Sequence, residues 1–129
     1  MSKRITFVTG NPHKLEEAKS VLKDYGIFVE APNGLENLCR MLDGFDDRSA
    51  VAACVFGYYD GQRVRLFRAE LRGAISEHPI GDGGFGWDKI FCPDGYGSKT
   101  RAELTPDEDA ETYRLFKPID SVRRFLATL

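Results

Sequence analysis

The stretch SAVAACVFGYYDGQRVRLFRAELRGAI, residues 49–75, decides the fold of this chain. Its first half, Ser49–Tyr59, is a long apolar run with β-branched and aromatic members, which is typical of a strand. Asp60-Gly61 follows as a strong two-residue hairpin signal, and residues 62–75 return as a second strand. Two long paired strands of this kind predict the spine of a β-sheet.

The returning strand is rich in arginine and has an alternating pattern. Val64 and Leu66 alternate with Arg63 and Arg65, so this half of the strand is expected to have one wet face. Gly73 is expected to mark a bulge. A solvated sheet face is the favoured interpretation of the arginines, and a polyphosphate site is the alternative.

The composition indicates one soluble globular domain over residues 1–129, since 42% hydrophobic and 29% charged residues are ordinary values. A net charge of −2 argues against a nucleic-acid partner, which usually requires a basic excess. A membrane span needs about 18 consecutive apolar residues, and no apolar run in this sequence is nearly that long, so no membrane partner is expected. The three cysteines show no CxxC spacing, and the N-terminus lacks the apolar core of a signal peptide. Both features predict a cytoplasmic protein with reduced thiols. A catalytic thiol is the disfavoured alternative.

Before the hairpin, the sequence predicts a strand, a tight turn and a helix. Residues 4–9 are a short apolar run expected to form a buried strand. Asn11 suits an N-cap, Pro12 suits the first helical position, and apolar residues at helical spacing lead to a stop at Gly26. A helix N-terminus attracts phosphate, and an anion would neutralise Lys14 in the first turn. This predicts a phosphate site, with a solvated surface lysine as the alternative.

A second strand and a short helix complete the part before the hairpin. Residues 27–31 resemble a strand, and residues 33–36 match a capping box that starts a helix ending near Gly44. Asp46 and Asp47 follow in a loop. They could bind a metal, but adjacent loop acids are more often solvated turn residues, which is the favoured interpretation.

After the hairpin comes a glycine-rich loop, IGDGGFGWDKIF, residues 80–91. Its glycines let the backbone approach a ligand closely. Phe85 and Trp87 offer faces on which a base can stack, and Asp88 can accept hydrogen bonds from the edge of a heterocycle. The pattern predicts a loop that grips a flat ring such as a nucleobase. The alternative is a turn between strands with Trp87 filling the core.

The remainder of the chain predicts a short strand and two helices. Residues 90–93 are strand-like, and residues 105–108 form a capping box with proline at the first helical position. The helix that starts there ends before Pro118. A last helix carries its apolar residues on one face, namely Ile119, Val122, Phe125, Leu126 and Leu129.

Three motifs of this chain resemble those of the inosine triphosphate pyrophosphatase family. Residues 9–17, TGNPHKLEE, look like its TGNxxKxxE motif, and residues 85–95, FGWDKIFCPDG, look like its FGWDPxFxPxG motif. Ala102-Glu103-Leu104, followed by Thr112-Tyr113-Arg114, is similar to its AEM…SHR ending. Members hydrolyse ITP, XTP and dITP to a monophosphate and pyrophosphate. The resemblance implies an α/β fold, a long mixed β-sheet with flanking helices and one lobe reduced.

The resemblance also implies roles for individual residues. The implied phosphate-binding residues are Thr9, Gly10, Asn11 and Lys14. The implied base-binding residues are Phe85, Gly86, Trp87, Asp88, Tyr113 and Arg114. Lys14 and Glu17 are the implied catalytic residues. Tyr113 stands where the family has histidine. The lysine that the family carries upstream of this motif is lost here, and its position falls near Glu108. The preferred base is therefore left open.

One departure from the family concerns its metal site. The family usually carries, between the second strand and the helix near residue 33, a segment whose carboxylates hold Mg²⁺ and activate the attacking water. Here residues 30–34 bridge directly across. We expect Mg²⁺ as cofactor with Glu17 as the candidate ligand, a purine nucleoside triphosphate as substrate, and a homodimer, because the family is commonly dimeric.

Two other functions are weighed against hydrolysis. One is an inactive purine-nucleotide-binding module that has lost its metal-site carboxylates. The other is a structural remnant that binds nothing specific, which the retained Lys14 and the complete loop at residues 85–88 disfavour.

Overall fold

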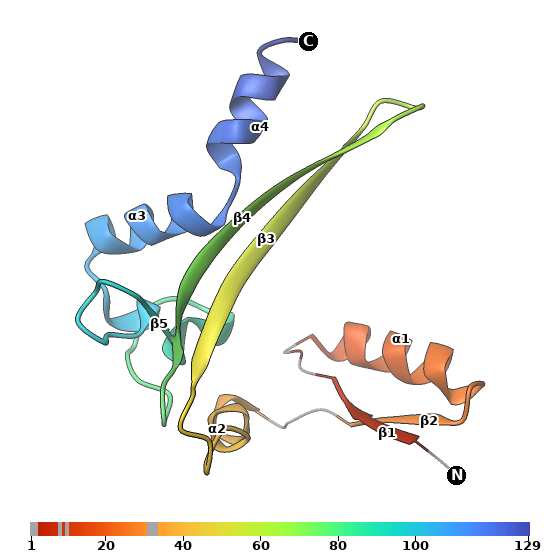
Figure 1. Ribbon diagram of the computed structural model, residues 1–129, viewed down its shortest axis with the longest axis vertical. Helices are drawn as coiled ribbons and strands as arrows, with labels where there is room; N and C mark the ends of the chain where they lie inside the picture. The colour runs from red at the N-terminus through yellow and green to blue at the C-terminus, as the bar shows by residue number, and fades with distance from the viewer. Residues whose placement is uncertain (1–2, 8, 10, 31–33) are drawn as a thin grey trace.

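The computed structural model describes residues 3–7, 9, 11–30 and 34–129 (Figure 1). In chain order the elements are β1 (Lys3–Thr6), α1 (Pro12–Lys23), β2 (Ile27–Glu30), α2 (Gly34–Arg40), β3 (Ser49–Tyr59), β4 (Val64–Ile75), η1 (Gly86–Lys89), β5 (Phe91–Pro93), η2 (Arg101–Glu103), α3 (Pro106–Phe116) and α4 (Ile119–Leu126). The α/β class is confirmed. The strands divide into a parallel pair, β1-β2, and an antiparallel sheet, β3-β4-β5.

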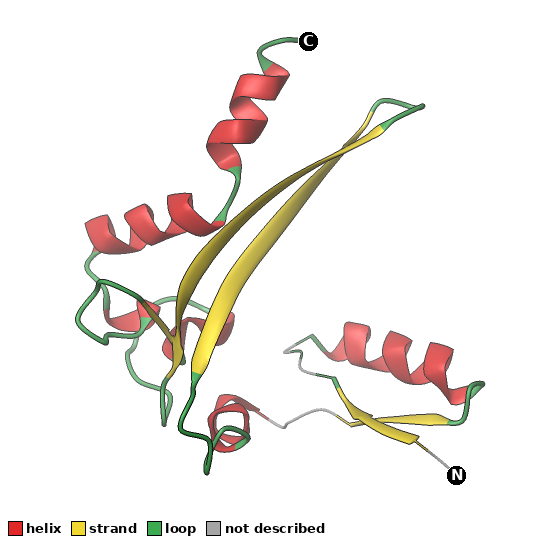
Figure 2. Ribbon diagram, in the orientation of Figure 1, coloured by secondary structure: helices red, strands yellow, loops and turns green. Residues whose placement is uncertain are grey.

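The long hairpin of β3 and β4 is the spine of the structure, as predicted (Figure 2). Its register runs without a slip from Ser49 opposite Ala74 to Tyr59 opposite Val64. β3 ends at Tyr59 as predicted, but β4 begins at Val64, two residues later than predicted, so residues 60–63 connect the strands. The Asp60 carboxylate accepts from the amides of residues 62 and 63 at 2.8 and 2.7 Å, which closes this longer turn.

Gly73 does not form the predicted bulge. It pairs with Ala50 on one side and Pro93 on the other, within an unbroken register. A Cβ at this position would overlap the carbonyl oxygen of Cys92. The glycine is therefore required because β5 approaches the β4 backbone closely.

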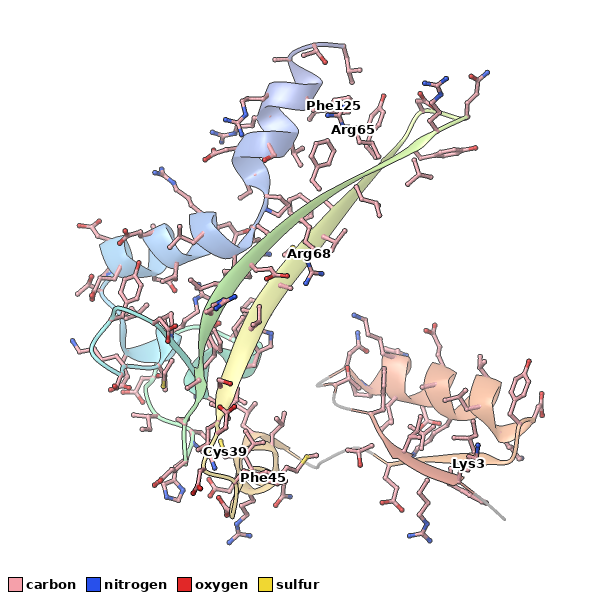
Figure 3. All side chains as sticks on the ribbon, viewed as in Figure 1. Lys3, Cys39, Phe45, Arg65, Arg68 and Phe125 are labelled. Carbon is pink, nitrogen blue, oxygen red and sulfur yellow. The ribbon has the colours of Figure 1, made fainter. Side chains whose placement is uncertain are left out.

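The two faces of the hairpin's far half are the reverse of those predicted. Val64 and Leu66 face solvent, whereas the Arg65 guanidinium lies 4.5 Å from the ring centre of Phe125 on α4 and 5.4 Å from that of Phe67 (Figure 3). Alternation alone assigns arginine to the wet side. Here α4 supplies an aromatic ring, and a guanidinium stacks favourably on such a ring.

The core lies between the hairpin and α3. Its buried cluster consists of Ala52, Leu71, Phe91 and Phe116. At the same end of the hairpin, Arg48 ties α2 to the sheet, because its guanidinium donates to the carbonyls of Cys39 and Ser76 at 2.9 and 2.8 Å. The core thus supports the segment that follows β5.

The parallel pair β1-β2 and α1 form a small layered unit. Asn11 is the N-cap of α1, and Gly26 has a φ of +68° just after the helix, as predicted. The prediction of a buried first strand is wrong: all four residues of β1 are exposed. A two-stranded sheet with one helix leaves an open face, which the apolar pattern does not reveal. The predicted cap of α2 falls on residue 33, outside the described residues.

The C-terminal helices follow their sequence signals. Thr105 and Glu108 form the predicted capping box, each side chain accepting from the other's amide, at 3.2 and 3.1 Å. α3 ends at Phe116, before the proline at 118. α4 ends at Leu126, so Leu129 lies beyond it and is exposed. In the described part of the chain, no helix is both long and apolar enough to cross a bilayer.

Candidate functional site

The glycine-rich loop folds back onto η2. The Gly83 amide donates to the carbonyl of Ala102 at 3.3 Å. Gly84 has a φ of +67°, and a Cβ there would stand 2.5 Å from a carboxylate oxygen of Asp88. These glycines are needed for close packing of the loop on its own neighbours, whatever the loop binds.

Asp88 fixes the shape of the loop from inside. It is only 7% exposed. One carboxylate oxygen accepts from the Phe85 amide at 3.0 Å, and the other accepts from a guanidinium nitrogen of Arg101 at 2.5 Å. Both oxygens therefore already have protein donors. This geometry favours a loop-folding role over the contact with a base edge that the sequence predicts.

Arg101 is the residue that sequence analysis missed. Its side chain is 5% exposed and contacts both the glycine loop and α3. Besides Asp88, it donates to Asp109 at 2.8 Å and to the hydroxyl of Thr112 at 3.0 Å. Its guanidinium carbon also lies 4.9 Å from the ring centre of Phe116. The sequence signal that could have led to Arg101 is the need for a cation to neutralise Asp88 if that aspartate is buried.

The aromatic rings predicted to bind a base differ in their surroundings. Phe85 is 87% exposed at the tip of the loop. Trp87 is 40% exposed, and its other side meets Phe91 and Phe116 edge-on, with ring centres 5.4 and 5.8 Å apart. The core-filling interpretation of Trp87 is thus met in part, and the exposed part of the indole leaves base stacking as a prediction.

The predicted residues of α3 lie beside this wall of rings. The Tyr113 ring meets that of Phe116 edge-on, with ring centres 5.9 Å apart, and Phe116 also contacts Trp87. Arg114 is exposed on the same helix. The structure thus joins Trp87 and Tyr113 through one shared ring.

The predicted phosphate end lies at the start of α1. The Asn11 side chain accepts from the amides of His13 and Lys14, at 3.0 and 3.4 Å, and the Thr9 hydroxyl accepts from the Asn11 amide at 3.1 Å. The side chains of Lys14 and Glu17 belong to exposed residues of the helix, and residue 10 lies outside the described residues. The amides expected to bind phosphate are therefore capped internally.

The described residues do not assemble a metal site. Among them, no group of three or more His, Cys, Asp or Glu side chains is placed to hold an ion. Asp47 accepts from the amide of Ser49 at 2.8 Å, and hydrogen bonds from Ser49 lower the pKa of that carboxyl. This agrees with the favoured turn-residue interpretation. Mg²⁺ prefers close carboxylate oxygens in fixed geometry, which this donor set does not supply.

The cysteines are free thiols. Burial raises the pKa of both Cys39 and Cys92. A thiol with a raised pKa is a poor nucleophile because little thiolate is present, which disfavours a catalytic role for these two residues.

The two predicted ends of the site come from different parts of the fold. In the view of Figure 1, α3 lies on one side of the hairpin and α1 on the other. Within the described chain, no hydrogen bond, ion pair or ring contact joins Lys14 to Phe85 or Trp87. The structure places Trp87 and Tyr113 against one shared ring and leaves the residues predicted to bind phosphate apart from them.

Comparison with known proteins adds the following. The model of the Ham1 family matches residues 28–117, which include the glycine loop and α3 and exclude α1. An inosine triphosphate pyrophosphatase of Scheffersomyces stipitis is 42% identical over 97 residues, or 74% of this chain and 49% of that protein. A dITP/XTP pyrophosphatase of Methanopyrus kandleri is 35% identical over 115 residues, or 78% of this chain and 61% of that protein.

The chain therefore spans about half to three fifths of the length of these curated relatives. Among solved structures, the Ham1 protein of Staphylococcus aureus aligns with a TM-score of 0.63 at 17% identity, covering 98% of this chain and 99% of that one. At this identity the likeness shows the fold alone.

Proposed function

Because this chain belongs to the Ham1 family, we propose that it hydrolyses the non-standard purine nucleoside triphosphates ITP, XTP and dITP to a monophosphate and pyrophosphate. The observation that carries this proposal is the pair of accessible rings, Phe85 and Trp87, on a loop fixed from behind by Asp88 and Arg101. A planar base stacks on such rings. The names of the relatives from Scheffersomyces stipitis and Methanopyrus kandleri support the substrate class.

The base end of the site is assigned to the loop and α3. Phe85, Gly86 and Trp87 form the platform on which the base stacks. Tyr113 and Arg114 supply polar groups to its edge, where a tyrosine hydroxyl can donate or accept and a guanidinium can donate to a 6-oxo group. Asp88 acts in this proposal by holding the platform.

The phosphate end is assigned to Thr9, Gly10, Asn11 and Lys14. In the reaction, water attacks the α-phosphorus, the bond to the bridging oxygen breaks, and pyrophosphate leaves with its added negative charge. The Lys14 ammonium would stabilise that charge, as cations do in phosphoryl transfer. Glu17 lies one turn along the same helix. We propose that its carboxylate activates the attacking water by accepting its proton.

Mg²⁺ is the expected cofactor of the reaction. The described residues do not present a ligand set for it, so no step is assigned to a protein-bound metal. The requirement for Mg²⁺ remains a prediction, which the following assay tests.

We expect the protein, at near-stoichiometric concentration, to release pyrophosphate from ITP, XTP and dITP in the presence of Mg²⁺ and not in EDTA. ATP and GTP should be poorer substrates. Replacing Lys14 with alanine should lower the rate about 100-fold, because a charge-stabilising donor is lost. Lys19→Ala is the matched control, since Lys19 lies on the same helix and pairs with Glu16 at 3.5 Å. Full activity of the Lys14 variant would contradict the assignment.

The second candidate function is purine-nucleotide binding without turnover. The observation that favours it is the carboxylate arrangement, which supplies no cluster of three among the described residues. Trp87 is the only tryptophan, so its fluorescence reports on stacking. Quenching by ITP without pyrophosphate release from any substrate would establish this second function in place of the first.

A homodimer in a reducing compartment, the cytoplasm, is also proposed. The free thiols favour such a compartment. The outer face of the hairpin exposes a row of apolar side chains, which is typical of a protein–protein contact. This row consists of Val51, Val55, Tyr59, Val64 and Leu66.

Introducing a charge into this row should separate the subunits. Leu66 is 67% exposed, so glutamate fits there without disturbing the core, but its charge would be buried in a dimer. Light scattering is expected to give twice the chain mass for the wild type and the chain mass for Leu66→Glu. Val21→Glu, at an exposed position of α1, should remain dimeric. A monomeric wild type would refute the dimer.

A further inference from the structure

We propose that Arg101 is a positioning residue for base recognition, which holds the glycine loop and α3 at a fixed separation so that their rings form one wall for a purine. This inference rests on the proposed nucleotide function and deepens it. Arg101 itself does not reach the ligand, because its side chain is 5% exposed and its guanidinium is engaged by three side chains.

The contacts of Arg101 divide between the two parts of the wall. On the loop, it donates to one carboxylate oxygen of Asp88, and the other oxygen accepts a hydrogen bond from the Phe85 amide. On α3, it binds Asp109 and the hydroxyl of Thr112, and this hydroxyl in turn donates to the Asp109 carbonyl at 2.9 Å. One side chain therefore sets where the loop stands relative to the helix.

The charges explain why this position needs a cation. Asp88 and Asp109 both bind the guanidinium, and without it the buried carboxylate of Asp88 would lose its cationic partner while the half-exposed Asp109 repels it. Lysine would supply the charge but not the planar fork, so it cannot satisfy both carboxylates and the hydroxyl in the same geometry.

The aromatic rings transmit this placement to the binding surface. The guanidinium lies over Phe116, and Phe116 meets both Trp87 and Tyr113 edge-on. If the loop shifts relative to α3, the spacing between Trp87 and Tyr113 changes with it. A planar base would sense this change, whereas a phosphate group bound elsewhere would not.

The first test needs no ligand and follows amide hydrogen exchange in Arg101→Lys and Arg101→Met. We expect exchange across residues 84–90, and at the Phe85 amide in particular, to become about tenfold faster or more, with the hairpin amides unchanged. Arg65→Met is the matched control, because it removes a ring-stacked guanidinium at the far end of the hairpin. If Met is not tolerated, the lysine variant and Asp109→Asn answer the same question. Loop exchange equal to that of the wild type would overturn the proposal.

The second test separates base recognition from phosphate recognition by titrating ITP and tripolyphosphate, which has no base. Arg101→Lys should weaken ITP binding about tenfold and leave tripolyphosphate binding unchanged, because only the base contacts the wall. Equal weakening of both ligands, or of neither, would overturn the positioning role. A wild-type protein that binds no ITP would overturn the proposed function instead, and the exchange experiment would still decide on Arg101.

Discussion

Replacing Arg101 with methionine is expected to lower the free energy of unfolding by about 3 kcal/mol, because the buried carboxylate of Asp88 loses its partner. The loss should appear as a lower midpoint in urea, followed by the fluorescence of Trp87 and by circular dichroism of the backbone. A domain of this size is stable by only about 5–15 kcal/mol, so the change is a large fraction of the total.

Two further variants identify the cause. In Asp88→Asn/Arg101→Met the buried charge is removed together with its partner, so part of the stability should return. Arg68→Met breaks an exposed pair with Glu70 and should cost less than about 1 kcal/mol. If the Arg101 variant were no less stable than the Arg68 variant, the buried network would not contribute to stability.

Truncating Trp87 to alanine is expected to weaken ITP binding by about 1–3 kcal/mol, the value of one base–aromatic stack, as measured by calorimetry. The same change should also destabilise the fold by about 3 kcal/mol, because the indole packs against Phe91 and Phe116. Phe85→Ala should weaken binding by a similar amount with little effect on stability, since this ring is exposed.

The control for this pair of variants is Phe45→Ala, which removes another exposed phenylalanine, at the α2 end of the hairpin (Figure 3). It should leave ITP binding unchanged. Unaltered binding in Phe85→Ala would show that the loop tip does not contact the base, and only the indole would remain in the proposed platform.

The features that the sequence predicted well are those encoded by neighbouring residues. The Asn11 and Thr105 caps are local hydrogen bonds within three residues, so residue type and spacing suffice to find them. The hairpin is equally local, because an apolar run, a turn and a second run specify it together. The loop at residues 80–91 was located by its glycines and aromatic residues, and Trp87 shares the neighbour Phe116 with Tyr113; its binding of a base stays a prediction.

The features that the sequence did not predict depend on what packs from elsewhere. The exposure of β1 follows from the number of strands beside it, and the inverted faces around Arg65 follow from the arrival of Phe125. Gly73 is explained by β5 and not by its own strand. Arg101 was missed for the same reason, since a lone arginine carries no periodic signal and its partners are identified only by proximity.

The hydrogen bonds of Arg101 have a consequence for how the site assembles. Their partners lie 8, 11 and 13 residues away along the chain. Short loops close at little entropic cost and favour rapid folding, so the wall of rings requires no long-range closure once its supporting sheet is present. Arg101, its hydrogen-bond partners and the rings of the wall all lie between Ile80 and Lys117. We therefore expect insertions or deletions before the hairpin to change the proposed phosphate end while leaving the wall of rings intact.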